Sequence, residues 1–160
     1  MKLMIFFLLM LPILTFAQSD EAPSTKWHFE ANMAALSMRQ SESPLVGPSA
    51  VHRTCDKLSL GFRTLMSLSG TATESLVSAS LLQRYHFNST KTSMFLELSE
   101  TYNQIKRSRY FPSIGTALGL NHQLSNYFSV GGLGGFEADL DHNDSTVIYP
   151  KVMAFIAVKM

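Results

Sequence analysis

The stretch at residues 113–121 decides the fold, and it reads Ser113-Ile114-Gly115-Thr116-Ala117-Leu118-Gly119-Leu120-Asn121. One parity is mainly apolar, whereas the other carries only small or polar residues. Successive side chains of a β-strand point to opposite faces, so a period of two indicates a strand with one apolar face. A helix is disfavoured because glycine recurs and apolar residues do not repeat at spacings of three and four.

The same period runs through most of the chain. Seven alternating segments are separated by clusters of Asn, Ser, Gly and Asp, which favour turns, at about 27–38, 57–69, 75–87, 91–104, 110–122, 127–138 and 147–160. Several have ten or more residues, whereas a typical globular strand has about five or six and a tilted transmembrane strand about 9–11. An irregular strand at about 44–54, with Pro44 and Pro48, makes the number even. We therefore expect an all-β fold, a single antiparallel up-and-down transmembrane β-barrel of eight strands.

The N-terminus has a different pattern. Lys2 is followed by an apolar run from Leu3 to Phe16, and small residues stand at Thr15 and Ala17. This pattern is typical of a cleaved secretory signal peptide, and the run is shorter than the roughly 20 residues of a membrane-spanning helix. We expect a signal peptide at 1–17, a short linker at 18–26 and a β-barrel domain at 27–160.

The composition narrows the function classes. The 13 basic and 12 acidic residues nearly balance, so no charge excess indicates a nucleic acid partner. After Phe16 no apolar run is long enough for a transmembrane helix. The apolar residues must therefore line a buried core or a surface that faces lipid. Cys55 is the only cysteine, so no intramolecular disulfide can form.

Aromatic residues gather near the ends of the expected strands. With the N-terminus in the periplasm, the lower belt contains Trp27, Phe29, Tyr85, Phe87, Tyr127 and Phe128. The upper belt contains Tyr102, Tyr110, Phe111, Phe136 and Tyr149. Such belts are typical of membrane–water interfaces, so the grouping favours lipid around the apolar face.

Six charged residues share the inward parity of this barrel, and they are Glu30, Arg63, Arg84, Glu97, Glu137 and Lys151. Unpaired buried charge is costly, so we expect these residues to pair as a charge network inside the lumen. Their expected role is to fill and stiffen a small barrel rather than to catalyse or transport.

Together, these features resemble the small eight-stranded outer-membrane β-barrel (porin-like) family of Gram-negative bacteria. The resemblance covers about 27–160 and includes the signal peptide, the alternating strands and tight turns such as 88–90 and 124–126. It implies a monomer in the cell outer membrane, with outer-membrane lipid, lipopolysaccharide and the barrel-assembly machinery as partners. Family members often end on an aromatic residue that this machinery recognises, whereas this chain ends on Met160.

The densest basic run is Lys106-Arg107-Ser108-Arg109. In the expected topology it lies at the outer rim, where Lys106, Arg107 and Arg109 would contact lipopolysaccharide phosphates, because basic clusters bind anionic lipid headgroups. A solvated turn is the alternative.

No pattern of residues indicates a catalytic, cofactor or metal site. Asp139, Asp141, Asn143 and Ser145 resemble the opening of a calcium loop, but Asp144 and Pro150 stand where that loop needs glycine and glutamate. The histidines have no metal-binding spacing. The glycine run 131–135 leads into no helix, which excludes a dinucleotide loop, and no nucleophile elbow is present.

The preferred hypothesis is an integral outer-membrane barrel with a filled lumen and a structural or surface-interaction role, in envelope integrity or adhesion. Eight strands leave room only for side chains, so we expect no large-solute pore. One alternative is a soluble periplasmic or secreted barrel that binds a lipid or other apolar ligand, because parity alone does not decide which face is outside. A second alternative is a membrane-embedded lipid-modifying enzyme.

Overall fold

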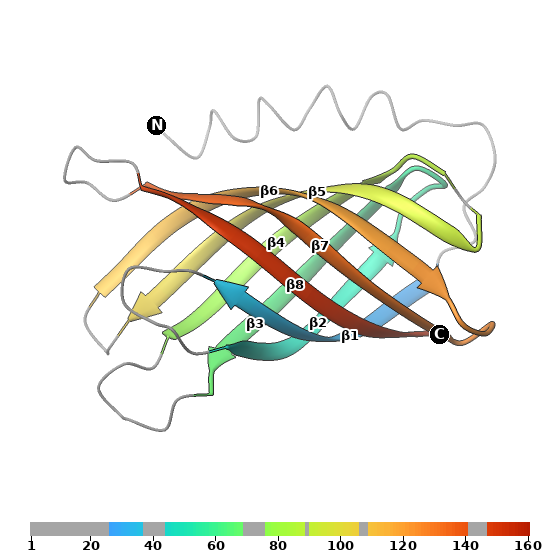
Figure 1. The fold of residues 1–160 in the computed structure, drawn as a ribbon, viewed down its shortest axis with the longest axis horizontal. Coiled ribbons are helices and arrows are strands. Elements are labelled where there is room, and N and C mark those ends of the chain that lie inside the picture. Colours follow the sequence, from blue (N-terminus) through green and yellow to red (C-terminus); the bar gives the residue numbers. More distant parts are fainter. Residues whose placement is uncertain (1–25, 37–43, 69–75, 89, 106–108, 141–146) are drawn as a thin grey trace.

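The fold is a closed barrel of eight antiparallel strands (Figure 1). The computed structural model describes residues 26–36, 44–68, 76–88, 90–105, 109–140 and 147–160. The strands are β1 (Lys26–Leu36), β2 (Leu45–Arg53), β3 (Leu58–Ser67), β4 (Leu76–His86), β5 (Thr92–Ile105), β6 (Arg109–Gln123), β7 (Phe128–Asp139) and β8 (Ile148–Lys159). Each strand pairs with its neighbours in sequence, and β1 pairs with β8 to close the barrel. The predicted all-β, up-and-down barrel of eight strands is confirmed.

The segment expected to be the signal peptide, 1–17, lies outside the described residues, as does nearly all of the linker. None of the described residues forms a helix with the length and apolarity needed to cross a membrane.

The irregular strand predicted at 44–54 is β2, and its proline has a visible effect on the pairing. Pro48 pairs with Ala31 of β1, but the ladder to β3 is interrupted between Val46 and Ser49. Proline has no N–H to donate to a neighbouring strand. A Cβ added to Gly47 would lie 2.0 Å from the carbonyl oxygen of Thr64, so the backbones of β2 and β3 approach closely here.

The two ends of the barrel differ. The turns after β2, β4 and β6 lie at the same end as the C-terminus, which is the right-hand end in Figure 1 and is called the short-turn end below. The opposite end is called the loop end. The segments that join the strands there, 37–43, 69–75, 106–108 and 141–146, lie outside the described residues.

Burial alternates along the strands. In β8, Lys151, Met153 and Phe155 face the lumen and are buried, whereas Val152 and Ile156 face outward and are exposed. The same alternation places charged, hydroxyl and amide side chains inside the barrel together with apolar ones such as Leu45, Leu65 and Leu133, and it places mainly large apolar side chains outside. Buried charge beneath an exposed apolar surface differs from the pattern of soluble proteins, which bury apolar residues and expose charged ones.

The aromatic residues predicted for the lower belt lie at the short-turn end. Trp27, Phe29, Phe87, Tyr127 and Phe128 are exposed there, and Tyr85 is half-buried.

The upper belt was predicted only in part. Tyr102 and Phe136 are exposed on the outer face, but Phe111 and Tyr149 face the lumen and are buried. Phe111 stands two residues before the inward Ser113, so its parity directs the ring inward although it lies near a strand end. The side chain of Tyr110 is not described.

Two lumen rings pack against glycines on neighbouring strands. A Cβ added to Gly119 would lie 2.2 Å from Cζ of Phe95, and one added to Gly131 would lie 2.3 Å from Cζ of Phe155. The two ring centroids are 6.3 Å apart. Glycine within a strand often marks a close approach of this kind. Gly119 of β6 and Gly131 of β7 therefore provide the space that two aromatic rings occupy inside the barrel.

We expect Gly119→Ala to destabilise the barrel by about 1–3 kcal/mol, because the new methyl group overpacks the fully buried Phe95 ring. Gly134→Ala is the matched control, since it faces outward with no atom within 4 Å of the added Cβ. Its change in unfolding free energy should stay within about 0.5 kcal/mol. Urea titration followed by the fluorescence of the single tryptophan, Trp27, measures both. Equal losses in the two variants would contradict the close packing.

Candidate functional site

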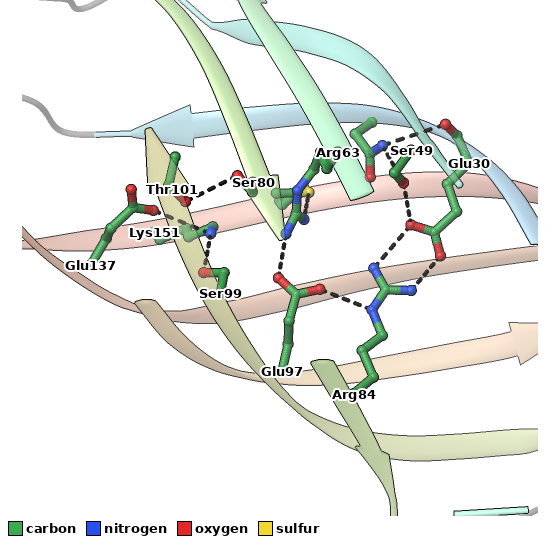
Figure 2. Close-up of polar contacts among 12 residues, drawn as sticks. Glu30, Ser49, Arg63, Ser80, Arg84, Glu97, Ser99, Thr101, Glu137 and Lys151 are labelled. Carbon is green, nitrogen blue, oxygen red and sulfur yellow. Dashed lines mark hydrogen bonds and ion pairs between the residues drawn. The ribbon is translucent and has the colours of Figure 1, made fainter. Parts of the chain in front are cut away.

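The centre of the lumen is organised around Arg84 of β4 (Figure 2). Its guanidinium binds both carboxylate oxygens of Glu30 on β1, with Nη2 donating to Oε2 at 2.9 Å and Nη1 donating to Oε1. Nε of Arg84 donates to Oε2 of Glu97 on β5 at 2.9 Å. One arginine therefore neutralises two carboxylates from different strands through charge-assisted hydrogen bonds.

The chain of ion pairs continues through Glu97 to β3. The second carboxylate oxygen of Glu97 accepts a hydrogen bond from Nη2 of Arg63, and Nη1 of Arg63 lies 2.9 Å from the sulfur of Met153 on β8. All four charged residues of the chain Glu30–Arg84–Glu97–Arg63 are buried. Strands β1, β3, β4 and β5 are thus joined across the lumen as well as through their backbone ladders.

A second cluster lies beside the first. Nζ of Lys151 on β8 is 3.2 Å from Oε2 of Glu137 on β7, and the Ser113 hydroxyl donates to Oε1 of Glu137 at 2.5 Å. Nζ of Lys151 also donates to the hydroxyl of Ser99 at 3.4 Å. Ser99 stands two residues from Glu97 on the inward face of β5, so the two clusters are adjacent (Figure 2).

Strand register explains part of this arrangement. Arg84 and Glu97 are directly opposite each other on β4 and β5, and Glu30 is opposite Ser49 on β1 and β2. Ser49 donates to Oε2 of Glu30 at 2.7 Å and accepts from Nδ2 of Asn32 at 2.9 Å. Cross-strand neighbours on one face interact in this way in sheets generally.

Aromatic rings cover the short-turn side of the ion pairs. The guanidinium carbon of Arg84 lies 4.8 Å from the ring centroid of Phe95 and 5.3 Å from that of Phe155. These distances suit cation–π attraction, which strengthens when the cation is removed from water.

The six charged residues predicted to form a lumen network are therefore brought together by the structure, and every one of the six carboxylate oxygens accepts at least one hydrogen bond or ion pair. Three acidic and three basic groups balance. Nε of Arg63 has no hydrogen-bond partner, but each of the six charged groups is closely paired, which is the condition under which buried charge is tolerated.

The sequence did not single out the neutral members of the network. Asn32, Ser49, Ser99 and Ser113 bind the charged groups, and their inward parity was the signal that could have identified them. The rings of Phe95 and Phe155, which pack on Arg84, were likewise not identified from the sequence as part of this site.

The other residues singled out from the sequence are not brought into this site. Lys106 and Arg107 lie outside the described residues, and Arg109 begins β6 at the loop end with its side chain undescribed. Of the calcium-like residues, Asp139 ends β7, whereas Asp141, Asn143 and Ser145 are not described. Among the residues that the structure does describe, no group of three His, Cys, Asp or Glu side chains could hold a metal ion.

The fold and lumen define a class of protein, the small closed barrel of eight antiparallel strands with an apolar outer face and an ion-paired interior. Two similar solved structures are of this size. The N-terminal β-barrel domain of Pseudomonas aeruginosa OprF has a TM-score of 0.67 at 12% identity, covering 84% of this chain and 97% of that one. Neisserial surface protein A (NspA) has a TM-score of 0.58 at 14% identity, and the match covers 88% of this chain and 99% of that one. No family model and no curated protein matches the sequence.

We expect Arg84→Met to lower the free energy of unfolding by about 3–5 kcal/mol, because it leaves Glu30 buried without a cationic partner. Adding Glu30→Gln removes that buried charge, so the double variant should be more stable than Arg84→Met alone. Urea unfolding of both variants and the unaltered chain measures the effect. A double variant less stable than Arg84→Met would contradict the assigned pairing.

Proposed function

We propose that this protein is an integral outer-membrane barrel with a filled lumen, whose role is structural or a surface interaction in envelope integrity or adhesion. The observation that carries the proposal is the distribution of side chains, with large apolar residues around the outside and paired charges inside. An exposed apolar surface of this extent calls for a covering, and the acyl chains of a bilayer supply one. Small eight-stranded barrels with this alternation are found in bacterial outer membranes.

A soluble barrel that binds an apolar ligand is less well supported. Such a ligand would occupy the lumen, where Arg63, Arg84, Glu97 and their partners lie instead. Apolar ligands favour pockets lined mainly by hydrophobic side chains. No observation on the described residues favours the lipid-modifying enzyme.

The side chains inside the barrel support the proposal of a filled lumen and a structural role rather than passage of solutes. Eight strands leave an interior just wide enough for side chains. Here the Arg84 and Lys151 clusters, together with Phe95 and Phe155, occupy it. The same contacts join strands that are not backbone neighbours, which stiffens the barrel.

The orientation of the barrel in the membrane is inferred from outer-membrane barrels, in which short turns face the periplasm and longer loops face the exterior. The short-turn end would then be periplasmic, and the basic run 106–109 would lie at the outer surface. The contact of Lys106, Arg107 and Arg109 with lipopolysaccharide stays a prediction, as do the assembly machinery as a partner and the monomeric state.

Two matched substitutions test whether lipid surrounds the barrel. Leu118 is 57% exposed in the middle of β6, and Leu124 is 59% exposed in the turn that follows. We expect Leu118→Arg to cost about 2–4 kcal/mol, as arginine does at the bilayer midplane, whereas Leu124→Arg should cost about 0–1 kcal/mol, as near an interface. Urea unfolding in lipid vesicles measures both. Small and equal costs would favour the soluble barrel.

The proposed function itself is tested by cell fractionation and by solute flux. The protein should be recovered in the outer-membrane fraction, with an electrophoretic mobility in detergent that changes on heating. Vesicles containing it should take up sugars no faster than protein-free vesicles. Recovery in the soluble periplasm without a mobility shift would overturn the membrane barrel, whereas sugar uptake would overturn the filled lumen.

A further inference from the structure

A polar cavity of about 70 Å³ lies at the short-turn mouth of the lumen, next to the Arg84–Glu30 pair. It is lined by side chains from both ends of the sequence, among them His28 of β1, Arg53 of β2, His86 of β4 and Lys159 of β8. A liquid water occupies about 30 Å³, so the cavity has room for a group of about two waters in size.

The lining is strongly biased toward positive charge. Arg53, Lys91 and Lys159 line the cavity in addition to Arg84, and Glu30 is the one carboxylate in that lining. The charge of Glu30 is already paired, since Arg84 binds both of its carboxylate oxygens and Ser49 binds one of them. Arg53, Lys91 and Lys159 therefore add positive charge to the lining beyond the Arg84 network, and Nζ of Lys159 also donates to Oε1 of Gln123 at 3.2 Å. Low-dielectric walls lined by one sign of charge concentrate the opposite ion.

Three of the lining residues hold a buried polar atom without a hydrogen-bond partner. These atoms are Nε of Arg53, Nδ1 of His86 and Oδ1 of Asn121. Nη2 of Arg53 donates to the carbonyl oxygen of Asp56 at 2.5 Å, which fixes the guanidinium at the rim. Nε2 of His86 lies 2.9 Å from the Ser59 hydroxyl. In the tautomer in which Nε2 accepts a hydrogen bond from this hydroxyl, Nδ1 carries the ring proton and is a donor.

Buried polar atoms without partners are costly and uncommon. Nε of Arg53, and Nδ1 of His86 in that tautomer, are donors in a cationic cavity, so they indicate a ligand rich in acceptors. A protonated phosphate oxygen would also donate to Oδ1 of Asn121. Arginine and lysine side chains bind the oxygens of phosphate groups through charge-assisted hydrogen bonds. We propose that the short-turn mouth of the lumen is a binding site for a small oxyanion of the phosphate class, held by Arg53, Lys91 and Lys159 with His86 as a neutral donor. Under the proposed orientation the site faces the periplasm, but its chemistry does not depend on the membrane.

The test is calorimetric titration of the folded chain with inorganic phosphate, in a maltoside detergent at low salt and in a buffer without other oxyanions. We expect saturable binding with one site per chain. Arg53→Gln should weaken it about tenfold or more, because a charge-assisted hydrogen bond is lost. Lys91→Gln, at an exposed position, should also weaken binding.

Lys57→Gln is the matched control. Lys57 is exposed in the turn at the same end but does not line the cavity, so it removes the same charge without touching the site. Binding by this variant should stay within about twofold of the unaltered chain, a difference far below one charge-assisted hydrogen bond. All variants are first checked for the heat-dependent mobility of the folded barrel, so that a folding defect is not read as lost binding.

The source of the phosphate group is resolved by adding phosphatidylglycerol to the micelles. Displacement of bound inorganic phosphate would assign the site to a lipid headgroup, and no displacement would assign it to a free anion; both outcomes support an oxyanion site. Absence of saturable phosphate binding, or equal weakening by Arg53→Gln and Lys57→Gln, would overturn the proposal.

Discussion

The structure depends most on the bonds between Arg84 and the two carboxylates of Glu30 and Glu97. A barrel of eight strands has an interior just wide enough for side chains. Here charged and other polar side chains lie in it beside apolar ones. Each charge placed there carries a large desolvation penalty, which only close partners offset. The network satisfies this condition because the Arg84 guanidinium binds both oxygens of Glu30 and donates from Nε to one oxygen of Glu97. Arg63 donates to the other oxygen of Glu97.

The remaining features follow from accommodating that network in a narrow space. Gly119 and Gly131 leave room for the rings of Phe95 and Phe155, which in turn cover the Arg84 guanidinium. Because the lumen charges are paired inside and the backbone ladder is closed, the outer face can be apolar. A closed ladder is also what a strand protein needs in lipid, because no backbone group is left at a free edge. The same interior leaves a cationic cavity at the short-turn mouth, where the network ends.

Much of this arrangement could be predicted from the sequence, because the period of two directly reports which face a residue occupies. It located β2 despite Pro48 and placed all six lumen charges on the inward face. The pairing could not be predicted in full. Arg84 and Glu97 are cross-strand neighbours, but Glu30 reaches Arg84 from a strand that is not adjacent to β4, and that contact depends on how the strands stagger around the barrel. Phe111 and Tyr149 were misplaced because their position near a strand end was weighed above their parity.

The most direct test of the central claim is solid-state NMR of the isotope-labelled protein in lipid bilayers. It would measure dipolar couplings between the guanidinium nitrogens of Arg84 and the side-chain carboxyl carbons of glutamate. If the ion-pair network is formed as described, Arg84 should couple to both Glu30 and Glu97. Absence of either coupling would contradict the network.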